Sequence, residues 1–492
     1  MADAIFKHPS FARRSSRVSE QSTGPGHPSP LAASFFASAA TLVHASVPPE
    51  PAPALPDLAP TPGSGSLPFS HHFFDVTHVV ATARTVYLRT LAIGVVGVGV
   101  IVFSMCAIYW GSIWVTPHRA LPGWIVDFDG DVVGRAVTRT LGGRPGNAGT
   151  NGIVWQVVAA SAFPRGVSQL EDAIAEEKTW AAVAINPGAS SNLLAALSDV
   201  DSSYNSSLAM TFIGSEARSE AEYRNIILPF ISSQLEKASR AFALDFARNI
   251  STSANANASA LLSTAPQIIT EPISYAIKNV RPFDVPVASA VTFVGLIYLL
   301  ILAFFVLLVS NAARVASGLE QRLTLGSLIW VRLLTAIGAY FFVALFYALL
   351  SCAFRLPLGR RFGKAGFVIF WMLNWVGMAA CGLALEAIAT LLTVRFVPLF
   401  LIFWIISNMS VAGYPLEVLP RAYSFGYAYP FYNMERAVRT IVFGTKDNVG
   451  LNFGILIAWV AVSCITLPLF QWWRRRGDVA AHRRLSSSEG KA

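Results

Sequence analysis

Residues 91–109 have the sequence LAIGVVGVGVIVFSMCAIY, nineteen positions without a charged side chain. A helix of about 20 apolar residues is long enough to cross the roughly 30 Å hydrocarbon core of a bilayer. Arg84 and Arg89 precede this run, and Trp110 and Trp114 follow it. Basic residues gather on the cytoplasmic side of a membrane and tryptophans at its interfaces. The stretch therefore predicts a first membrane-spanning helix whose N-terminal end is cytoplasmic.

The composition of the whole chain supports a membrane protein. Of its 492 residues, 54% are hydrophobic and only 13% are charged, whereas soluble proteins carry about 25% charged residues. The net charge of +9 comes from the apolar C-terminal part and the tail, while residues 111–284 are slightly acidic. The low charged fraction excludes an ordinary cytosolic enzyme. Nucleic-acid binding requires a basic domain, so the slightly acidic region 111–284 argues against a nucleic-acid partner.

Five further apolar runs predict membrane spans in the C-terminal half: Val287–Val309, Leu333–Phe354, Phe367–Leu385, Val397–Val411 and Phe453–Trp472. Six spans place both termini on one side, and Arg474–Arg476 after the last span marks that side as cytoplasmic. The basic loop 355–364 then falls outside, against the charge rule. The predicted fold is an α-helical integral membrane protein with six transmembrane helices and an α+β extracytoplasmic domain between helices 1 and 2.

The predicted parts follow in chain order: a disordered cytoplasmic tail rich in Pro, Ser and Ala at 1–84, transmembrane helix 1 at 85–110, the extracytoplasmic domain at 111–284, a membrane domain of five helices at 285–473 and a basic cytoplasmic tail at 474–492. Within the extracytoplasmic domain, the apolar patterns predict strands at Trp124–Phe128, Val154–Ala159, Trp180–Ile185 and Ala209–Ile213. They predict helices at Val132–Leu141, Val167–Glu177 and Glu216–Ile250, the last amphipathic and kinked at Pro229.

Several short motifs, in this order, carry a family resemblance: YWGSIW at 109–114, LPGWIVD at 121–127, WAAVAIN at 180–186, EARSE at 216–220, ILP at 227–229 and NMERAVR at 433–439. Together they resemble the fungal nitrosoguanidine-resistance family of membrane proteins, over roughly residues 85–475. One span, a large external domain and five further spans is also similar to the layout of type-2 ABC exporter permeases. The resemblance implies a drug- or stress-resistance role at a membrane, with no known substrate.

Catalytic motifs are weak in this sequence. Asp127-Phe128-Asp129-Gly130 after an apolar strand is similar to the motif of Mg²⁺-dependent phosphatases of the haloacid-dehalogenase type. However, Asp131 stands where that motif has Thr or Val, and a strand-to-helix turn is the alternative. Residues 111–284 hold one histidine, His118, and no cysteine, which gives little support to zinc or a Ser-His-Asp triad. The chain also has no ATP-binding loop. We therefore expect no enzyme and no cofactor.

Polar residues in the predicted spans are the candidate transport-path residues. Glu386 and Asn374 lie in the fourth predicted span, and ionisable groups in lipid are costly and often line a path. Glu386 stands at the predicted cytoplasmic end of its span. The alternative to a role in a transport path is therefore that water hydrates the side chain there. Candidate modification sites are the glycosylation sequons at Asn205, Asn249 and Asn257 and a phosphorylation site at Ser486.

The predicted function is export, or control of membrane access, of small amphipathic molecules or lipids. The first alternative is a non-transporting scaffold or sensor that binds a partner through its external domain, and the second is an external Mg²⁺-dependent phosphatase. The partners expected are membrane lipids, a small amphipathic substrate, a separate ATPase subunit and a second copy of the chain. The expected location is the plasma membrane or another secretory-pathway membrane.

Overall fold

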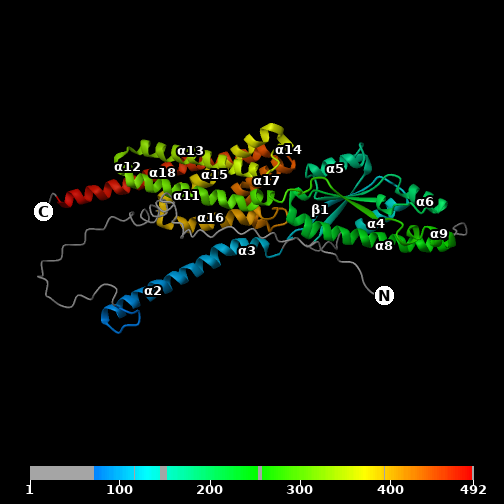
Figure 1. Cartoon of the computed structure of the whole chain (residues 1–492), viewed down its shortest axis with the longest axis horizontal. Helices are drawn as coiled ribbons and strands as arrows, with labels where there is room; N and C mark the ends of the chain where they lie inside the picture. Colours follow the sequence, from blue (N-terminus) through cyan, green and yellow to red (C-terminus); the bar gives the residue numbers. More distant parts are fainter. Residues whose placement is uncertain (1–70, 116, 144–151, 253–257, 393, 490–492) are drawn as a thin grey trace, which may run out of the picture. The chain divides into compact units, whose positions relative to one another are not determined.

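The computed structural model describes residues 71–489 except 116, 144–151, 253–257 and 393. Most of the predicted N-terminal tail, 1–70, and the candidate Asn257 lie outside the described residues. The described chain is mostly helical and contains one five-stranded sheet (Figure 1).

Five of the described helices are long and apolar enough to cross a membrane: His78–Ile113, Ala290–Ser317, Leu325–Ala353, Gly359–Leu392 and Val449–Val479. The prediction of six spans is not confirmed, because the remaining apolar helix, α16 (Val397–Ala412), has only 16 residues. At 1.5 Å per residue it is about 24 Å long, which is shorter than the roughly 30 Å hydrocarbon core.

These spans consist of several elements. The first joins α2 (His78–Ile101), a π-helical turn η1 (Val102–Cys106) and α3 (Ala107–Ile113). The second joins π-helical η6 (Ala290–Val294) to α11 (Gly295–Ser317), and α12 (Leu319–Arg322) leads to α13 (Leu325–Ala353). Next come α14 (Gly359–Phe362), η7 (Gly363–Ala365), α15 (Gly366–Leu392) and η8 (Val394–Phe396). After α16, the elements are η9 (Arg421–Ala428), α17 (Pro430–Phe443) and α18 (Val449–Glu489).

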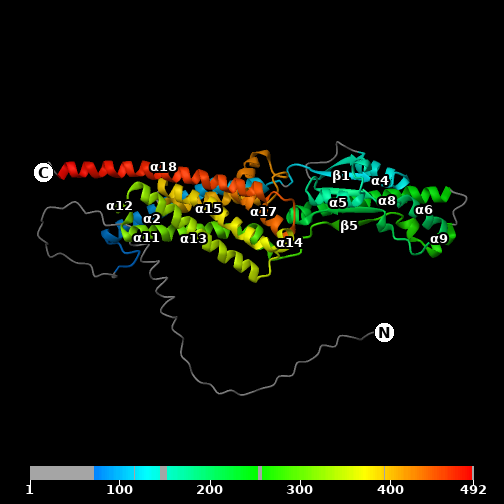
Figure 2. The same cartoon turned by 90° about the horizontal axis from the view of Figure 1, so that it is seen from above.

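Helix α15 is the centre of the helical part. It packs against α11, α13, α17 and α18, and Figures 1 and 2 show α11, α13, α15 and α18 running side by side. Small residues allow this close approach: a Cβ at Gly382 would lie 2.3 Å from the Tyr340 hydroxyl, and one at Gly377 would lie 2.3 Å from Cε of Met434. A side chain at either position would therefore require Tyr340 or Met434 to move.

The sheet domain follows the first span. Its strands are β1 (Leu121–Asp127), β2 (Ile153–Val158), β3 (Ala181–Ile185), β4 (Met210–Gly214) and β5 (Tyr275–Asn279), in the order β2-β1-β3-β4-β5. Only the β3–β4 pair is antiparallel. Its α-helices are α4 (Val132–Gly142), α5 (Val167–Ala175), α6 (Ala189–Asp199), α7 (Glu220–Glu222), α8 (Leu228–Thr252), α9 (Ala258–Thr264) and α10 (Gln267–Thr270). The short helical turns between these elements are η2 (Ala160–Ala162), η3 (Ser206–Leu208), η4 (Glu216–Arg218) and η5 (Tyr223–Ile227).

Alternation along the strands gives the sheet two buried faces. Ile125 packs in one hydrophobic cluster with residues of α4, α6 and α8, and its neighbour Val126 packs in another with residues of α5. Successive strand residues point to opposite faces, so α4, α6 and α8 cover one face of the sheet and α5 covers the other. The four predicted strands and the helices near 132 and 167 are found, while α6 and β5 were not predicted.

The long predicted helix at 216–250 is interrupted before Pro229. Residues Tyr223–Ile227 form a π-helical turn, and regular α8 begins at Leu228. Proline has no N–H to donate to the carbonyl four residues earlier, here that of Asn225, and the wider turn accommodates the missing bond. The structure thus has a π-helical turn directly before Pro229, and the kink itself stays a prediction.

Candidate functional site

A buried arginine of the sheet domain is the centre of the candidate site. Arg218 ends η4, directly after β4, and its side chain is 7% exposed. Its guanidinium lies 3.6 Å from the centre of the Trp180 ring, at cation–π distance. The carboxylates of Glu177 and Glu417 lie 3.7 and 3.6 Å from its nitrogens. Burial lowers the pKa of Arg218 to about 10 against the opposing effect of these carboxylates, so the side chain is charged at neutral pH.

Arg436 brings helix α17 to the same carboxylate. It forms an ion pair with Glu177, whose side chain is 4% exposed, and it donates to the backbone oxygen of Arg218 at 3.5 Å. Glu177 thus lies between two arginines, one from the sheet domain and one from α17. Its backbone has a φ of 58°, a left-handed conformation that costs a non-glycine residue roughly 1–2 kcal/mol. This conformation ends helix α5 (Val167–Ala175): the N–H groups of Glu177 and Lys178 donate to the backbone oxygens of Ile174 and Ala173, both at 3.0 Å.

A second pair of contacts joins the same two elements. Arg439, one turn after Glu435, forms an ion pair with it and donates to the backbone oxygen of Ala217 at 3.0 Å. Close by, Glu222 is fully buried and accepts a hydrogen bond from the Ser219 hydroxyl. Burial raises the pKa of Glu222 to about 7, although the bond from Ser219 acts in the opposite direction. The junction therefore contains a carboxyl group that titrates near neutral pH.

We call this set of charged residues the junction network: Glu177, Arg218, Glu222, Glu417, Glu435, Arg436 and Arg439. The cavity beside Arg218 and Arg436 measures only about 10 Å³, room for a single water at most. Among the described residues no cluster of His, Cys, Asp and Glu is arranged to hold a metal ion. The geometry suits a connection between the sheet domain and α17 rather than a binding pocket.

Three motifs that carry the family resemblance meet in the junction network. Trp180 comes from WAAVAIN, Arg218 from EARSE, and Arg436 and Arg439 from NMERAVR. Sequence reasoning used these motifs only for their order and did not predict their contact. Glu177 and Glu417 were missed, because an isolated glutamate between two elements has no pattern that distinguishes it from a surface residue.

Glu386 lies in a second buried network, made by the membrane helices alone. The side chain of Glu386 is 1% exposed, forms an ion pair with Arg332 of α13 and lies 3.8 Å from Arg314 of α11. Arg332 also donates to Gln471 of α18 at 2.5 Å. The alternative that Glu386 is simply hydrated is wrong, since protein surrounds it. Four helices contribute to this cluster: α11, α13, α15 and α18. Glu386 of α15 therefore has arginine partners on two neighbouring helices.

Asn374 is buried in α15 but lies apart from Glu386. It donates to the backbone oxygen of Phe370 at 2.7 Å, within its own helix. Twelve residues of helix separate it from Glu386, about 18 Å along the axis at 1.5 Å per residue. The structure therefore does not bring the two candidate path residues into one site.

Asp127 and Asp129 organise the turn between β1 and α4. Asp127 Oδ1 accepts from the backbone N–H groups of Asp129 and Gly130 at 3.0 and 2.8 Å. Asp129 accepts from the backbone and hydroxyl of Ser190 at 2.9 and 2.5 Å, and from the N–H of Gly134 at 3.3 Å. Both carboxylates are engaged in these bonds, and through Ser190 the turn is tied to α6.

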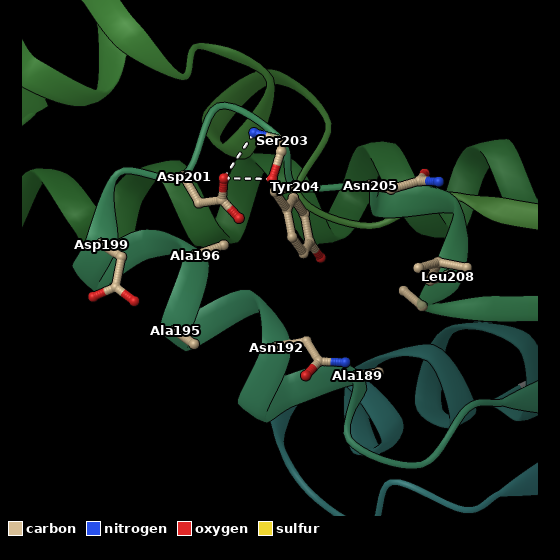
Figure 3. A pocket seen from close by; sticks show the side chains of 11 residues that line it. Ala189, Asn192, Ala195, Ala196, Asp199, Asp201, Ser203, Tyr204, Asn205 and Leu208 are labelled. Atoms are coloured by element: carbon tan, nitrogen blue, oxygen red, sulfur yellow. Dashed lines mark hydrogen bonds between the residues drawn. The ribbon is translucent and has the colours of Figure 1, made fainter.

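A pocket of about 350 Å³ opens in the sheet domain between α6 and residues 199–209 (Figure 3). Asn192 comes from α6, and Tyr204 and Asn205 come from the following loop. Asp201 is held at the rim, because it accepts from the backbone and hydroxyl of Ser203 at 2.8 and 2.7 Å. The lining combines alanines with carboxylate, amide and hydroxyl groups, which suits a small polar ligand.

The candidate modification sites lie in different surroundings. Asn205 is exposed and lines that pocket, and its Oδ1 accepts from the hydroxyl and N–H groups of Ser207 at 2.7 and 3.0 Å. Asn249 is exposed on α8. Ser486 lies in α18. Both described sequons thus belong to the sheet domain.

Comparison with known proteins supports the membrane assignment. The chain is 29% identical over 313 residues to an uncharacterized endoplasmic reticulum membrane protein of Saccharomyces cerevisiae. The match covers 60% of this chain and 59% of the yeast protein, so the chain spans about three-fifths of the length of that relative. No solved structure matches the chain.

The apolar helices and the yeast relative together show a multi-pass integral membrane protein. A family model described as "Protein of unknown function (DUF3533)" matches residues 95–465, which is most of the sequence and includes the whole junction network. The chain belongs to the DUF3533 family.

Proposed function

We propose that this protein moves small amphipathic molecules or lipids across a membrane, or controls their access to it, and that its sheet domain acts on the membrane helices through α17. The observation that carries the proposal is the ion pair between Arg436 of α17 and Glu177, which Arg218 shares. In this proposal α16 (Val397–Ala412) also crosses the membrane, as a short sixth span, so that the sheet domain lies outside the cytoplasm and both termini lie inside. The membrane belongs to the secretory pathway.

The energetics of buried ion pairs explain why this contact suits a coupling role. Removing one partner of a buried ion pair lowers the free energy of unfolding by about 3–5 kcal/mol, because the other charge is left uncompensated. The junction network therefore stabilises one relative position of the sheet domain and α17 strongly. Helix α17 in turn packs on α15, α16 and α18. A ligand or partner that alters the sheet domain can thus bias the arrangement of the helices.

The resemblance to nitrosoguanidine-resistance proteins and to type-2 ABC exporter permeases supports a transport role. The sequence contains no ATP-binding loop, so we propose that a separate ATPase subunit supplies energy where transport is uphill. We give Asp127 and Asp129 a structural role, since Oδ1 of Asp127 and both oxygens of Asp129 accept from N–H and hydroxyl groups around the β1–α4 turn. No catalytic role is proposed for them.

The test is transport by the purified chain in lipid vesicles. Flip of a fluorescent lipid and efflux of an amphipathic dye are measured for the wild type, Arg436→Gln and Arg240→Gln, with and without a co-purifying ATPase. Arg240 is 81% exposed and lies 3.5 Å from Glu236, so this control removes the same charge from the surface of the sheet domain. We expect flux with the wild type and the control and little with Arg436→Gln. Absence of wild-type flux under both conditions would refute the proposal.

A sensor is the second candidate, and the pocket beside α6 favours it. In that case a small polar ligand binds between Asn192 and Tyr204, and the junction network passes the effect to the helices without any transport. Binding of a ligand that alters protease protection of the membrane helices, in a chain that shows no flux, would support the sensor.

A further inference from the structure

The basic loop 355–364 that conflicts with the charge rule has specific partners beside the sheet domain. Arg360 donates both Nη groups to Asp284 at 2.8 and 2.9 Å, and Arg361 lies 3.7 Å from Asp447. Asp284 follows strand β5, so the loop lies at the same end of the helices as the sheet domain. These contacts explain how several positive charges are accommodated there.

A pocket of about 350 Å³ lies between this loop and the exit of the sheet domain. Three arginines line it, Arg281, Arg360 and Arg361, together with Phe443 and Gly444. The volume is far above the roughly 10–15 Å³ that a cavity needs to hold one water, so there is room for a phosphate group. Planar guanidinium groups are suited to bind phosphate through paired N–H donors.

The arginines retain donors for such a group. Arg281 uses Nε and Nη1 on the backbone oxygens of Gly444 and Val280, both at 3.0 Å, and its Nη2 makes no hydrogen bond to the described residues. Arg361 has its ion pair with Asp447 and no hydrogen bond to the described part of the chain. Within the described residues, the ion pairs of these three arginines involve two carboxylates, those of Asp284 and Asp447, so the pocket has an excess of positive charge.

Exposed apolar side chains lie near the ends of the helices that lead to and from this positive pocket. Helix α13 ends at Ala353, α15 begins at Gly366 and α18 begins at Val449, so the pocket lies where three membrane helices have their ends. Large apolar side chains near these ends are exposed: Leu350, Phe354, Val368 and Leu451. They provide a surface for acyl chains next to a pocket for a charged headgroup.

We propose that this pocket binds the phosphate headgroup of an anionic lipid whose acyl chains lie along α13, α15 and α18. The inference rests on the proposed function and names its ligand class. It also links the ligand to the junction network, because Arg281 accepts at its backbone oxygen from the N–H of Ala217 at 2.8 Å, and Ala217 in turn accepts from Arg439.

The experiment measures lipid binding by the full chain in a neutral detergent, with native mass spectrometry. The probes are dioctanoyl phosphatidic acid, dioctanoyl phosphatidylcholine and inorganic phosphate. We expect phosphatidic acid to bind roughly tenfold or more tightly than phosphatidylcholine. Its phosphomonoester carries up to two negative charges near neutral pH, whereas the phosphate of phosphatidylcholine carries one, which the choline cation balances. The variant Arg360→Gln/Arg361→Gln should lose this preference. Arg165→Gln, which removes an exposed arginine paired with Asp172 at 2.9 Å, should keep it.

A variant of the opposite sign guards against misfolding of the double variant. Asp447→Asn removes a carboxylate that competes for Arg361, and its amide oxygen can still accept from the N–H of Val449. We expect it to bind phosphatidic acid more tightly than the wild type.

Three results would overturn the assignment: equal binding of the two lipids, unchanged binding in both pocket variants, or displacement of phosphatidic acid by an equal concentration of inorganic phosphate. The last would indicate a site for a soluble anion. Because flux in vesicles is measured separately, failure of the lipid site with normal wild-type flux leaves the proposed function standing. If the chain binds phosphatidic acid selectively but shows no flux, only the proposal of transport is refuted.

Discussion

The Glu177 carboxylate lies between Arg218 of the sheet domain and Arg436 of α17, so one buried carboxylate joins two parts of the chain that are 218 residues apart. Figure 1 shows α17 among the helical elements and α5, which precedes Glu177, on the sheet. The contact is specific, because a shift of either element by a few ångströms would leave a buried charge without its partner.

The first prediction concerns the energy of this contact. Arg436→Gln should destabilise the protein by about 3–5 kcal/mol, because Glu177 is left as a buried charge beside only one arginine. Glu177→Gln should cost a similar amount. The double variant should cost less than the sum of the two, since it leaves no charge of this pair unpaired. Thermal unfolding in detergent measures all three, and additive effects would show that the residues are not coupled.

The second prediction is a pH dependence from Glu222. Burial raises its pKa in the fold to about 7, whereas an unfolded glutamate titrates near 4.3. The folded state therefore binds more protons than the unfolded state between these values, and the free energy of unfolding falls as the pH rises through them. The difference corresponds to about 3–4 kcal/mol. Glu222→Gln should remove this decline and be more stable than the wild type at pH 8.

Denaturation midpoints at pH 5, 6.5 and 8 test the role of Glu222. Glu236→Gln is a suitable control, since Glu236 is an exposed carboxylate on α8. If the denaturation midpoint changes by the same amount between pH 5 and pH 8 in the wild type and in Glu222→Gln, the pKa of Glu222 is not raised in the fold.

The sequence was most informative where the physics is local. The run at 91–109 and the apolar runs around α11, α13, α15 and α18 are found as long helices, because hydrophobic length alone predicts them. Val397–Val411 has the same composition, but Pro398 at the start of α16 and Gly413 at its end limit the helix to 16 residues. Whether a helix is long enough to cross the hydrocarbon core depends on such details. The number of spans was therefore harder to predict than the presence of spans.

The candidate site was less predictable, because its contacts are long-range. The short apolar run Trp180–Ile185 predicts a strand, but nothing local indicates that Trp180 packs on Arg218 or that Glu177 bonds to α17. The same holds for Glu386. Its position in an apolar run marked it as unusual, while its partners Arg314 and Arg332 looked like flanking charges. Helix packing brought them inside, where they form ion pairs.

The third prediction revises the expectation for Glu386. From the sequence alone, removing a charge from a membrane span should not harm insertion, and Glu386→Gln should keep normal levels. In the structure this change leaves Arg332 without its carboxylate and leaves Arg314 with that of Glu320, at 3.7 Å. We therefore expect a loss of about 3–5 kcal/mol and lower levels in the membrane. Glu386→Gln/Arg332→Gln should recover part of the loss, and equal levels of wild type and Glu386→Gln would contradict the buried network.

The last prediction separates a structural from a catalytic role for the β1–α4 turn. Asp127→Asn should leave stability and transport nearly unchanged, because an amide oxygen can still accept from the N–H groups of Asp129 and Gly130. Asp127→Ala leaves these donors without their acceptor and should cost about 1–3 kcal/mol. A phosphatase nucleophile would behave differently, since Asn and Ala would both abolish its activity. Unfolding midpoints and Mg²⁺-dependent hydrolysis of p-nitrophenyl phosphate distinguish the two cases. Hydrolysis by the wild type that both variants lose would assign chemistry to Asp127, whereas a stability loss confined to Asp127→Ala assigns it to the turn.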